Sequence, residues 1–97
     1  MPKAYMIFTE NVHDEAGLQA YLAAAAPTLT TGKLVVLDDN PETIEGTWHG
    51  TRTVMLEFES VEAAKEWYHS EEYSKARPLR LAAAECNAVL VTGFDAG

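Results

Sequence analysis

Glu57 is the residue whose type and position in this sequence best suit proton-transfer chemistry. It lies near the end of an alternating stretch, Thr53 to Phe58, on the side that also carries Thr53 and Met55. Alternation of period two is typical of a β-strand. We expect this side to face a second sheet, where a partly desolvated carboxylate has a raised pKa and can act as an acid or a base. The alternative is an end-of-strand glutamate that pairs with an arginine or reaches water.

His49 is the second candidate for proton transfer. It follows Trp48 in a Gly-bounded segment, residues 46–51, which is typical of a loop. Such a loop could close over the mouth of a pocket, and the alternative is a solvated loop histidine. The other histidines, His13 and His69, fall in different connections and show no metal-binding spacing, so we expect no metal ion.

The candidate ligand-binding residues are basic and aromatic. Arg52, Arg77 and Arg80 flank the central stretch, and an arginine can hold a carboxylate through two parallel hydrogen bonds. The alternative for each arginine is a structural salt bridge. Tyr5 and Tyr21 have hydroxyl groups that could line a cavity, although aromatic residues more often pack in a core. We therefore assign candidate catalytic roles to Glu57 and His49, and candidate ligand-binding roles to Trp48, Arg52, Tyr5 and Arg80. The sequence contains no complete catalytic motif, and we expect no cofactor.

The composition narrows the range of partners and compartments. The formal net charge of -8 disfavours binding to nucleic-acid backbones and to anionic membrane surfaces. Cys86 is the only cysteine, so no internal disulfide can form, and we expect a cytoplasmic protein. A small buried side chain is the first interpretation of Cys86 and a reactive thiol is the alternative. The first residues do not resemble a signal peptide, and no segment approaches the roughly 20 apolar residues of a membrane span.

Periodicity and capping residues predict the elements that position these side chains. Alternating apolar residues predict strands over 3–10, 33–37, 53–58 and 87–94, while 43–45 either continues the second strand past a break or forms a short edge segment. Helical spacing predicts helices over 15–26, capped by Asp14, and from 61 onward, capped by Ser60. Ser70 is expected to cap a further helical turn, and Pro78 to begin a short helix over 79–85. The tail, 95–97, is expected to fray.

The order of these elements predicts one α+β domain over residues 1–97. It is typical of a ferredoxin-like sandwich (β-α-β-β-α-β), in which a four-stranded antiparallel sheet carries its helices on one face. The first, third and last strands have apolar residues on both sides, but two helices cover only one face. A second copy of the chain is the simplest cover for the other face, so we expect a two-fold homodimer. A monomer with a wet apolar sheet is the alternative.

One long segment resembles a known family. The run V-M-L-E-F-E-S-V-E-A-A-K-E-W-Y-H-S-E-E-Y-S-K-A-R-P-L-R-L-A-A-A begins at Val54, and its most specific part is E-F-x-S-x-x-A-A-x-x-W-Y-x-S-x-E-Y, from Glu57 to Tyr73. This run is similar to the family called domain of unknown function 1330, in the dimeric α/β-barrel superfamily. With the pieces upstream, the resemblance spans about residues 3–93. The sequence departs from it at residues 31–33, Thr-Gly-Lys in place of a Gly pair and Arg, and at Glu59, where proline is common.

The resemblance implies a dimer whose two sheets pack face to face, and it implies no reaction. Relatives in the superfamily include oxygenases, haem proteins, decyclising enzymes and ligand binders, and a fold does not fix a function. Two functional hypotheses therefore remain. The first is a cofactor-independent small-molecule enzyme with its cavity between sheet and helices or between subunits. The second is a non-catalytic ligand-binding or structural dimer with the same cavity.

Overall fold

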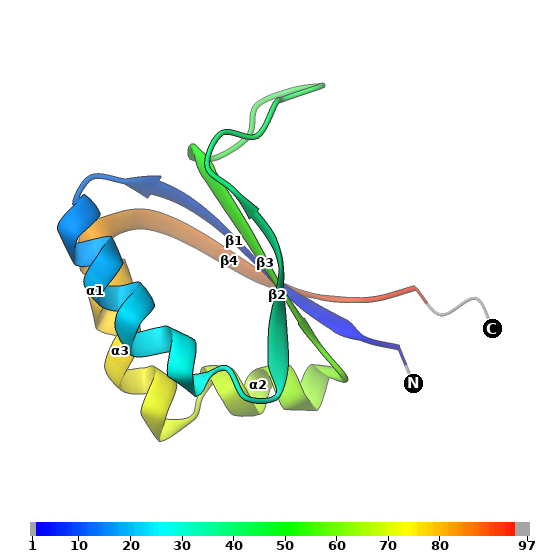
Figure 1. Cartoon of the computed structure of the whole chain (residues 1–97). Helices are drawn as coiled ribbons and strands as arrows, with labels where there is room; N and C mark the ends of the chain where they lie inside the picture. Colours follow the sequence, from blue (N-terminus) through cyan, green and yellow to red (C-terminus); the bar gives the residue numbers. More distant parts are fainter. Residues whose placement is uncertain (1, 95–97) are drawn as a thin grey trace.

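The computed structural model describes residues 2–94, and the tail predicted to fray, 95–97, lies outside the described residues. Its elements follow one another as β1 (Ala4–Val12), α1 (Glu15–Ala25), a short 3-10 turn η1 (Ala26–Thr28), β2 (Gly32–Asp38), β3 (Arg52–Phe58), α2 (Val61–Tyr68), α3 (Glu71–Ala83) and β4 (Ala84–Thr92). All helices lie on one side of a twisted sheet, while the connection between β2 and β3 extends away from the body (Figure 1). The predicted ferredoxin-like α+β arrangement is confirmed.

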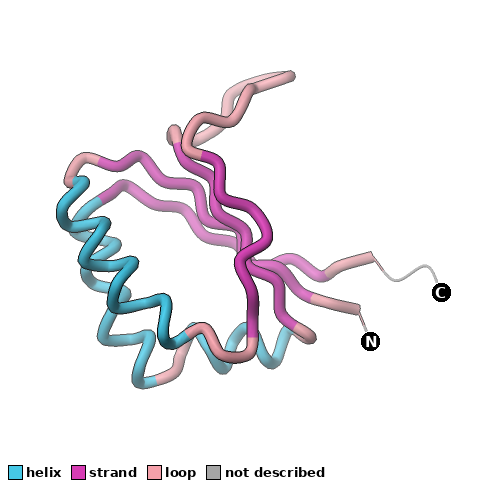
Figure 2. The backbone as a smooth tube through the Cα atoms, in the orientation of Figure 1, coloured by secondary structure: helices cyan, strands magenta, loops and turns pink. Residues whose placement is uncertain are grey.

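The four strands form one antiparallel sheet in the order β2-β3-β1-β4. Register pairs Tyr5 with Glu57 across β1 and β3, and Glu10 with Arg52 near the other end. The pairing of β2 with β3 shifts between Leu34 and Val36, which marks a β-bulge at this edge of the sheet. In Figure 2 the helices (cyan) lie on one side of the strands (magenta), so they cover one face of the sheet and leave the other uncovered.

Side-chain caps begin all three α-helices, as the sequence predicts. The carboxylate of Asp14 accepts from the N–H of Gly17 at 3.0 Å, and the hydroxyl of Ser60 accepts from that of Ala63 at 3.0 Å. Ser70 caps α3 in the same way, by accepting from the N–H of Tyr73 at 3.2 Å. Each cap satisfies a backbone donor that has no partner within the helix.

The predicted helix start at Pro78 is wrong, because Pro78 lies inside the continuous helix α3. An internal proline removes one backbone hydrogen bond and costs about 3 kcal/mol. In α3 the buried residues Tyr73, Ala76, Arg80 and Ala83 form one stripe that extends on both sides of Pro78. Burial of that stripe outweighs the local penalty, so tertiary packing decides the length of the helix.

The outer strands also differ from the prediction in their bounds. β1 and β4 extend together to Val12 and Ala84, which pair with each other, whereas the sequence predicts that they stop at 10 and start at 87. The predicted short strand over 43–45 is not present, and these residues belong to the loop between β2 and β3. Pairing between distant segments sets these boundaries, and local sequence patterns do not reveal it.

Within residues 2–94, no helix is long and apolar enough to cross a lipid bilayer.

The core lies between the sheet and the helices. Met6, Phe8, Leu56 and Phe58 point from the two central strands toward the helices and are buried. The helices contribute the other large core side chains: Leu18, Tyr21, Trp67 and Tyr73. Trp67 is the centre of an aromatic cluster, with its ring centroid 4.0 Å from that of Tyr73 and 5.6 Å from that of Phe58. This burial fixes α1, α2 and α3 against the sheet.

The opposite side of the sheet, which we call the open face, has no covering element in the described part of the chain. It carries six apolar or aromatic side chains at alternating strand positions: Tyr5, Ile7, Val36, Met55, Val89 and Val91. Val89 is 52% exposed and Val91 is 40% exposed. The prediction that the sheet has apolar residues on both faces is therefore confirmed.

Candidate functional site

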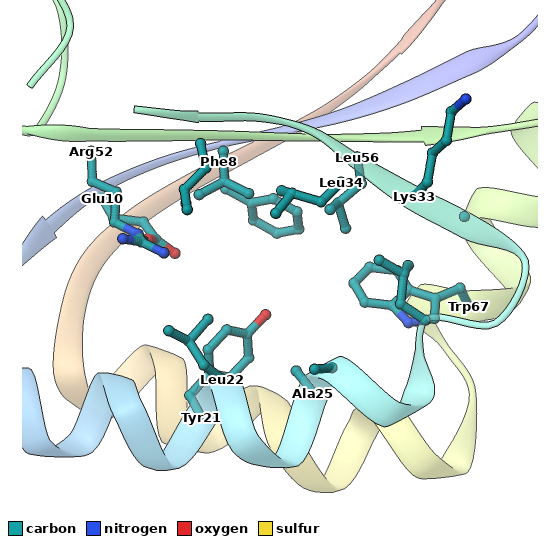
Figure 3. Close-up of a pocket in the computed structure, with 15 residues that line it drawn as sticks. Phe8, Glu10, Tyr21, Leu22, Ala25, Lys33, Leu34, Arg52, Leu56 and Trp67 are labelled. Carbon is teal, nitrogen blue, oxygen red and sulfur yellow. The ribbon is translucent and has the colours of Figure 1, made fainter. Parts of the chain in front are cut away.

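A cavity of about 540 Å³ lies between the covered face of the sheet and α1. Most of its wall is apolar, as the close-up in Figure 3 shows. The sheet contributes Phe8, Val54, Leu56, Leu34 and Leu37; the helical side contributes Tyr21, Leu22, Ala25, Ala26, Leu29 and Trp67; Gly32, Lys33, Glu10 and Arg52 complete the lining. The Lys33 side chain points away from the cavity, so its charge is not part of the interior (Figure 3).

The local sequence explains why the cavity forms at this position. Helical periodicity brings Tyr21, Leu22 and Ala25 onto the face of α1 that is turned to the sheet. The first residue of β2 is Gly32, where a Cβ atom would lie 2.5 Å from the ring of Phe58. A small residue is therefore needed where β2 begins, and β2 starts close to the core before it runs along the mouth of the cavity.

One corner of the cavity holds a buried ion pair. Register places Glu10 opposite Arg52, and both side chains point to the helix side of the sheet. The Nε atom of Arg52 donates to the Glu10 carboxylate at 3.0 Å, and these side chains are only 11% and 4% exposed. A second nitrogen of Arg52 donates to Asp39, which is 78% exposed, at 2.6 Å. Arg52 thus joins an enclosed carboxylate to one at the surface.

A hydrogen-bonded chain of three buried side chains lies beside the cavity. The hydroxyl groups of Tyr21 and Tyr73 are 2.9 Å apart, and the Nε atom of Arg80 donates to the Tyr73 hydroxyl at 3.4 Å. The Arg80 guanidinium also lies 4.9 Å from the ring centre of Phe8, which lines the cavity. Burial raises the pKa of Tyr21 far above its ordinary value, and the contact with Tyr73 adds to this effect. The Tyr21 hydroxyl therefore stays protonated.

The sequence-predicted residues divide between the two faces of the sheet. Arg52 lines the cavity, and Arg80 lies directly behind the rings of Phe8 and Tyr21. The other candidates, Glu57, His49, Trp48 and Tyr5, contact groups on the open face. The ligand-binding set expected from the sequence is therefore not gathered in one place.

Glu57 has several partners. The Tyr5 hydroxyl donates to it at 3.1 Å, and the ammonium groups of Lys33 and Lys3 lie 3.4 Å and 3.9 Å from its carboxylate. The same hydrogen bond raises the pKa of the Tyr5 phenol, with burial as the second cause. These contacts match the paired-glutamate alternative, although the partners are lysines and not the arginine that the sequence suggested. A catalytic role for Glu57 stays a prediction.

Trp48 and His49, at the end of the loop between β2 and β3, contact side chains of the open face. The indole N–H of Trp48 donates to the Thr53 hydroxyl at 2.9 Å, and His49 Nδ1 lies 2.9 Å from the Thr9 hydroxyl. Tyr5, which contacts Glu57, is four residues from Thr9 along β1, or about 13 Å. The structure thus keeps Glu57 and His49 apart within one chain, and their joint role in proton transfer is not supported by their positions.

The remaining candidates have structural partners. Arg77 donates to the backbone carbonyl of Tyr68 at 3.0 Å and lies over the ring of that tyrosine. Cys86 is a free, half-buried thiol. Burial raises the pKa of the Cys86 thiol, while the nearby Arg80 opposes this shift. Among residues 2–94, no group of three or more His, Cys, Asp or Glu side chains could hold a metal ion.

Glu10 is the site residue that the sequence analysis missed. The signal was present in the alternation of β1, because Glu10 follows Met6 and Phe8 at the same two-residue spacing. A charged residue that continues an inward-facing apolar series needs a buried partner. That partner, Arg52, lies 42 residues away in the sequence and is reached only through strand pairing.

These features define a small ferredoxin-like fold with a cavity under its helices. A family model for the domain of unknown function DUF1330 matches residues 3–94, and the chain belongs to that family. A search among proteins with curated functions finds no match.

Solved structures of similar fold include proteins of unknown function and one enzyme. The RPA0582 protein of unknown function from Rhodopseudomonas palustris is 17% identical, with a TM-score of 0.76 over 97% of this chain and 84% of that chain. A dimeric ferredoxin-like protein of unknown function from Jannaschia sp. CCS1 is 12% identical, with a TM-score of 0.69 over 92% and 97%. SnoaB, a cofactor-independent oxygenase from Streptomyces nogalater, is 11% identical, with a TM-score of 0.70 over 98% and 96%. At these identities the likeness shows the fold.

Proposed function

We propose that this protein binds a small, largely apolar molecule in the cavity beneath α1, and that it does so as a homodimer. The observation that carries the proposal is the cavity itself, with about 540 Å³ of space, apolar walls and one polar corner. Ligand sites in proteins commonly have volumes of about 300–1,000 Å³ and combine apolar walls with a few polar groups. We treat residues 1–97 as one domain of a cytoplasmic protein, and we assign it no cofactor.

Binding without catalysis is the favoured form of this proposal. A cavity built for proton transfer needs a buried titratable group without a structural partner. Glu10 is buried at the cavity, but Arg52 neutralises it at 3.0 Å. The alternative, a cofactor-independent enzyme, rests on Glu57 and His49, which lie on the open face. Under the favoured form, Glu57→Gln and His49→Ala both retain ligand binding in a thermal-shift assay.

Filling the cavity tests the proposal. Leu34 lines the cavity at its edge and is 51% exposed, so Leu34→Trp adds volume there without straining the closed core. Leu81→Trp, at a 57% exposed position of α3 outside the cavity, is the matched control. We expect apolar metabolites that raise the melting temperature of the wild-type protein to lose this effect in Leu34→Trp and keep it in Leu81→Trp. Equal stabilisation of both variants would place the ligand elsewhere.

The open face supports the dimer. Its apolar side chains form a continuous patch across β2, β3, β1 and β4, and each large side chain left in water forgoes roughly 1.5–3 kcal/mol of burial. A second copy offers the same patch, related by a two-fold axis. The dimeric ferredoxin-like neighbour from Jannaschia adds support by analogy of fold.

Light scattering tests the dimer directly. The chain has a mass of 10.6 kDa, and we expect a particle of twice that mass at micromolar concentration. Met55→Lys introduces a charge at the centre of the open face and should give the monomer mass. Leu81→Lys introduces the same charge on the outer side of α3 and should leave the dimer intact. A monomeric wild-type protein would contradict this part of the proposal.

A further inference from the structure

The charges around the cavity do not balance. Arg80 is 2% exposed, and no ion pair joins it to a carboxylate in the part of the chain from 2 to 94. The one enclosed carboxylate at the cavity, Glu10, is bound to the Nε atom of Arg52. The enclosed carboxylate thus pairs with Arg52, and Arg80 has no carboxylate partner among residues 2–94. A buried charge without a counter-charge is costly, so such groups are normally paired.

Contacts other than an ion pair stabilise the buried Arg80. Its position in the last turn of α3 and its stacking on the ring of Phe8, 4.9 Å away, are each favourable for a cation. Its Nε atom donates to the Tyr73 hydroxyl at 3.4 Å, and the Cys86 thiol is a second polar neighbour. None of these partners carries a negative charge, so an anion bound nearby would add a favourable electrostatic interaction with Arg80.

Tyr73 and Tyr21 link Arg80 to the cavity through two hydrogen bonds. Arg80 can only donate, so the Tyr73 oxygen accepts from it. We take Tyr73 as the donor to the Tyr21 oxygen, 2.9 Å away, because a hydroxyl that accepts from a cation becomes a stronger donor. The Tyr21 proton is left free, and Figure 3 shows the hydroxyl of Tyr21 directed into the cavity.

We infer that the cavity binds apolar monocarboxylates, whose carboxylate accepts a hydrogen bond from the Tyr21 hydroxyl and balances the charge of Arg80. This inference rests on the proposed function, because it names the chemical class of the ligand for the same cavity. The apolar walls, Leu22, Leu34 and Leu56 among them, receive the hydrocarbon part. Glu10 does not oppose the bound carboxylate, since Arg52 neutralises it at 3.0 Å.

Calorimetric titration with matched probes tests the inference. Octanoate, decanoate and dodecanoate are compared with the alcohols of the same chain lengths at neutral pH. A hydrogen bond to a charged group contributes enough free energy to make each acid bind roughly tenfold to a hundredfold more tightly than its alcohol.

Variants then assign the preference to the tyrosine chain. Tyr21→Phe keeps the ring and removes the donor, so it should lower acid affinity to that of the alcohols and leave the alcohols unchanged. Tyr73→Phe interrupts the link to Arg80 and should reduce acid affinity to a smaller extent. Tyr68→Phe is the matched control, because Tyr68 lies outside the cavity lining. Circular dichroism confirms that each variant is folded.

The possible results separate this inference from the proposed function. Equal binding of acids and alcohols to the wild type overturns the inference and leaves the apolar cavity as a ligand site. A preference for acids that survives Tyr21→Phe but is lost in Arg52→Gln also overturns it, because the carboxylate then binds at the other corner. Failure of both probe series to bind contradicts the proposed function as well.

Discussion

The two faces of the sheet use the same strands but enclose their side chains in different ways. On the covered face, Phe8, Leu56 and Phe58 pack against helices and against one another, and a charged pair is enclosed with them. On the open face, neighbouring positions of the same strands carry Ile7, Met55 and Glu57, which remain partly accessible. The covered face therefore contains the side chains that hold the fold together, and the open face is the surface on which the proposed dimer would form.

We expect the largest loss in the free energy of unfolding when Phe58 is replaced. It is 1% exposed, and Phe58→Ala removes a ring that contacts Trp67, at a cost of about 3–5 kcal/mol. Met55→Ala, three residues earlier on the open face, should destabilise an isolated chain much less. Urea unfolding at several protein concentrations separates the two, because a loss at a dimer surface depends on concentration and a loss in the core does not. Equal, concentration-independent losses would contradict the distinction between the faces.

The two paired glutamates provide the next comparison. Glu10→Gln removes a carboxylate from an enclosed guanidinium, and we expect a loss of about 2–3 kcal/mol, below the usual range for a broken buried pair because Arg52 keeps Asp39. Glu57→Gln affects contacts with lysines that are 44% and 70% exposed, and should cost about 0–1 kcal/mol. Chemical denaturation measures both. A larger loss for Glu57→Gln would mean that the open face is enclosed in the folded protein.

The two left-handed glycines of the β2–β3 loop test how closely it approaches the cavity corner. Gly46 and Gly50 have φ angles of +73° and +75°, so alanine costs about 1 kcal/mol at either position. At Gly50 an added Cβ would also clash with the backbone of Glu10, whereas at Gly46 it would meet no atom within 4 Å. We expect Gly50→Ala to lose about 2–4 kcal/mol in total and Gly46→Ala only about 1 kcal/mol. Thermal unfolding of the pair checks this difference.

The smallest expected effect is a change in the pKa of Glu59, which forms an exposed ion pair with Lys3. Lys3 donates to Glu59 at 2.9 Å, and this hydrogen bond lowers the pKa of Glu59 below its ordinary value of 4.5. A carboxyl group whose pKa falls on folding stabilises the fold above its unfolded pKa, and this contribution is lost as the pH falls through the folded pKa. In an NMR titration, Lys3→Gln should raise the pKa of Glu59 toward 4.5. Lys75→Gln on α3 should leave it unchanged.

Local features of the sequence were sufficient to predict most of the fold. Caps at Asp14, Ser60 and Ser70 act on backbone donors three residues away, so they are visible without tertiary information. Alternation in β1 and β3 likewise indicated which side chains share a face. The predicted helix start at Pro78 was wrong because its outcome depends on packing of the whole α3 stripe.

The cavity was harder to predict, because its polar groups come from distant segments. Glu10 meets Arg52 only through the register of β1 and β3. Arg80 is linked to Tyr21 through Tyr73, and the two tyrosines are 52 residues apart in the sequence. The sequence analysis named Arg52 and Arg80 but could not say that Arg52 has a carboxylate partner while Arg80 has none among residues 2–94. Residue type indicates possible chemistry, whereas the three-dimensional pairing decides which charge remains available.

The bulge in β2 has a consequence for solubility. β2 is an edge strand, and a regular, apolar edge is a template on which further chains add strands and aggregate. The register shift between Leu34 and Val36 interrupts the regular spacing of its outward N–H and C=O groups. Growth of an extended intermolecular sheet from this edge is therefore disfavoured, even though Leu34, Val35 and Leu37 are all exposed there.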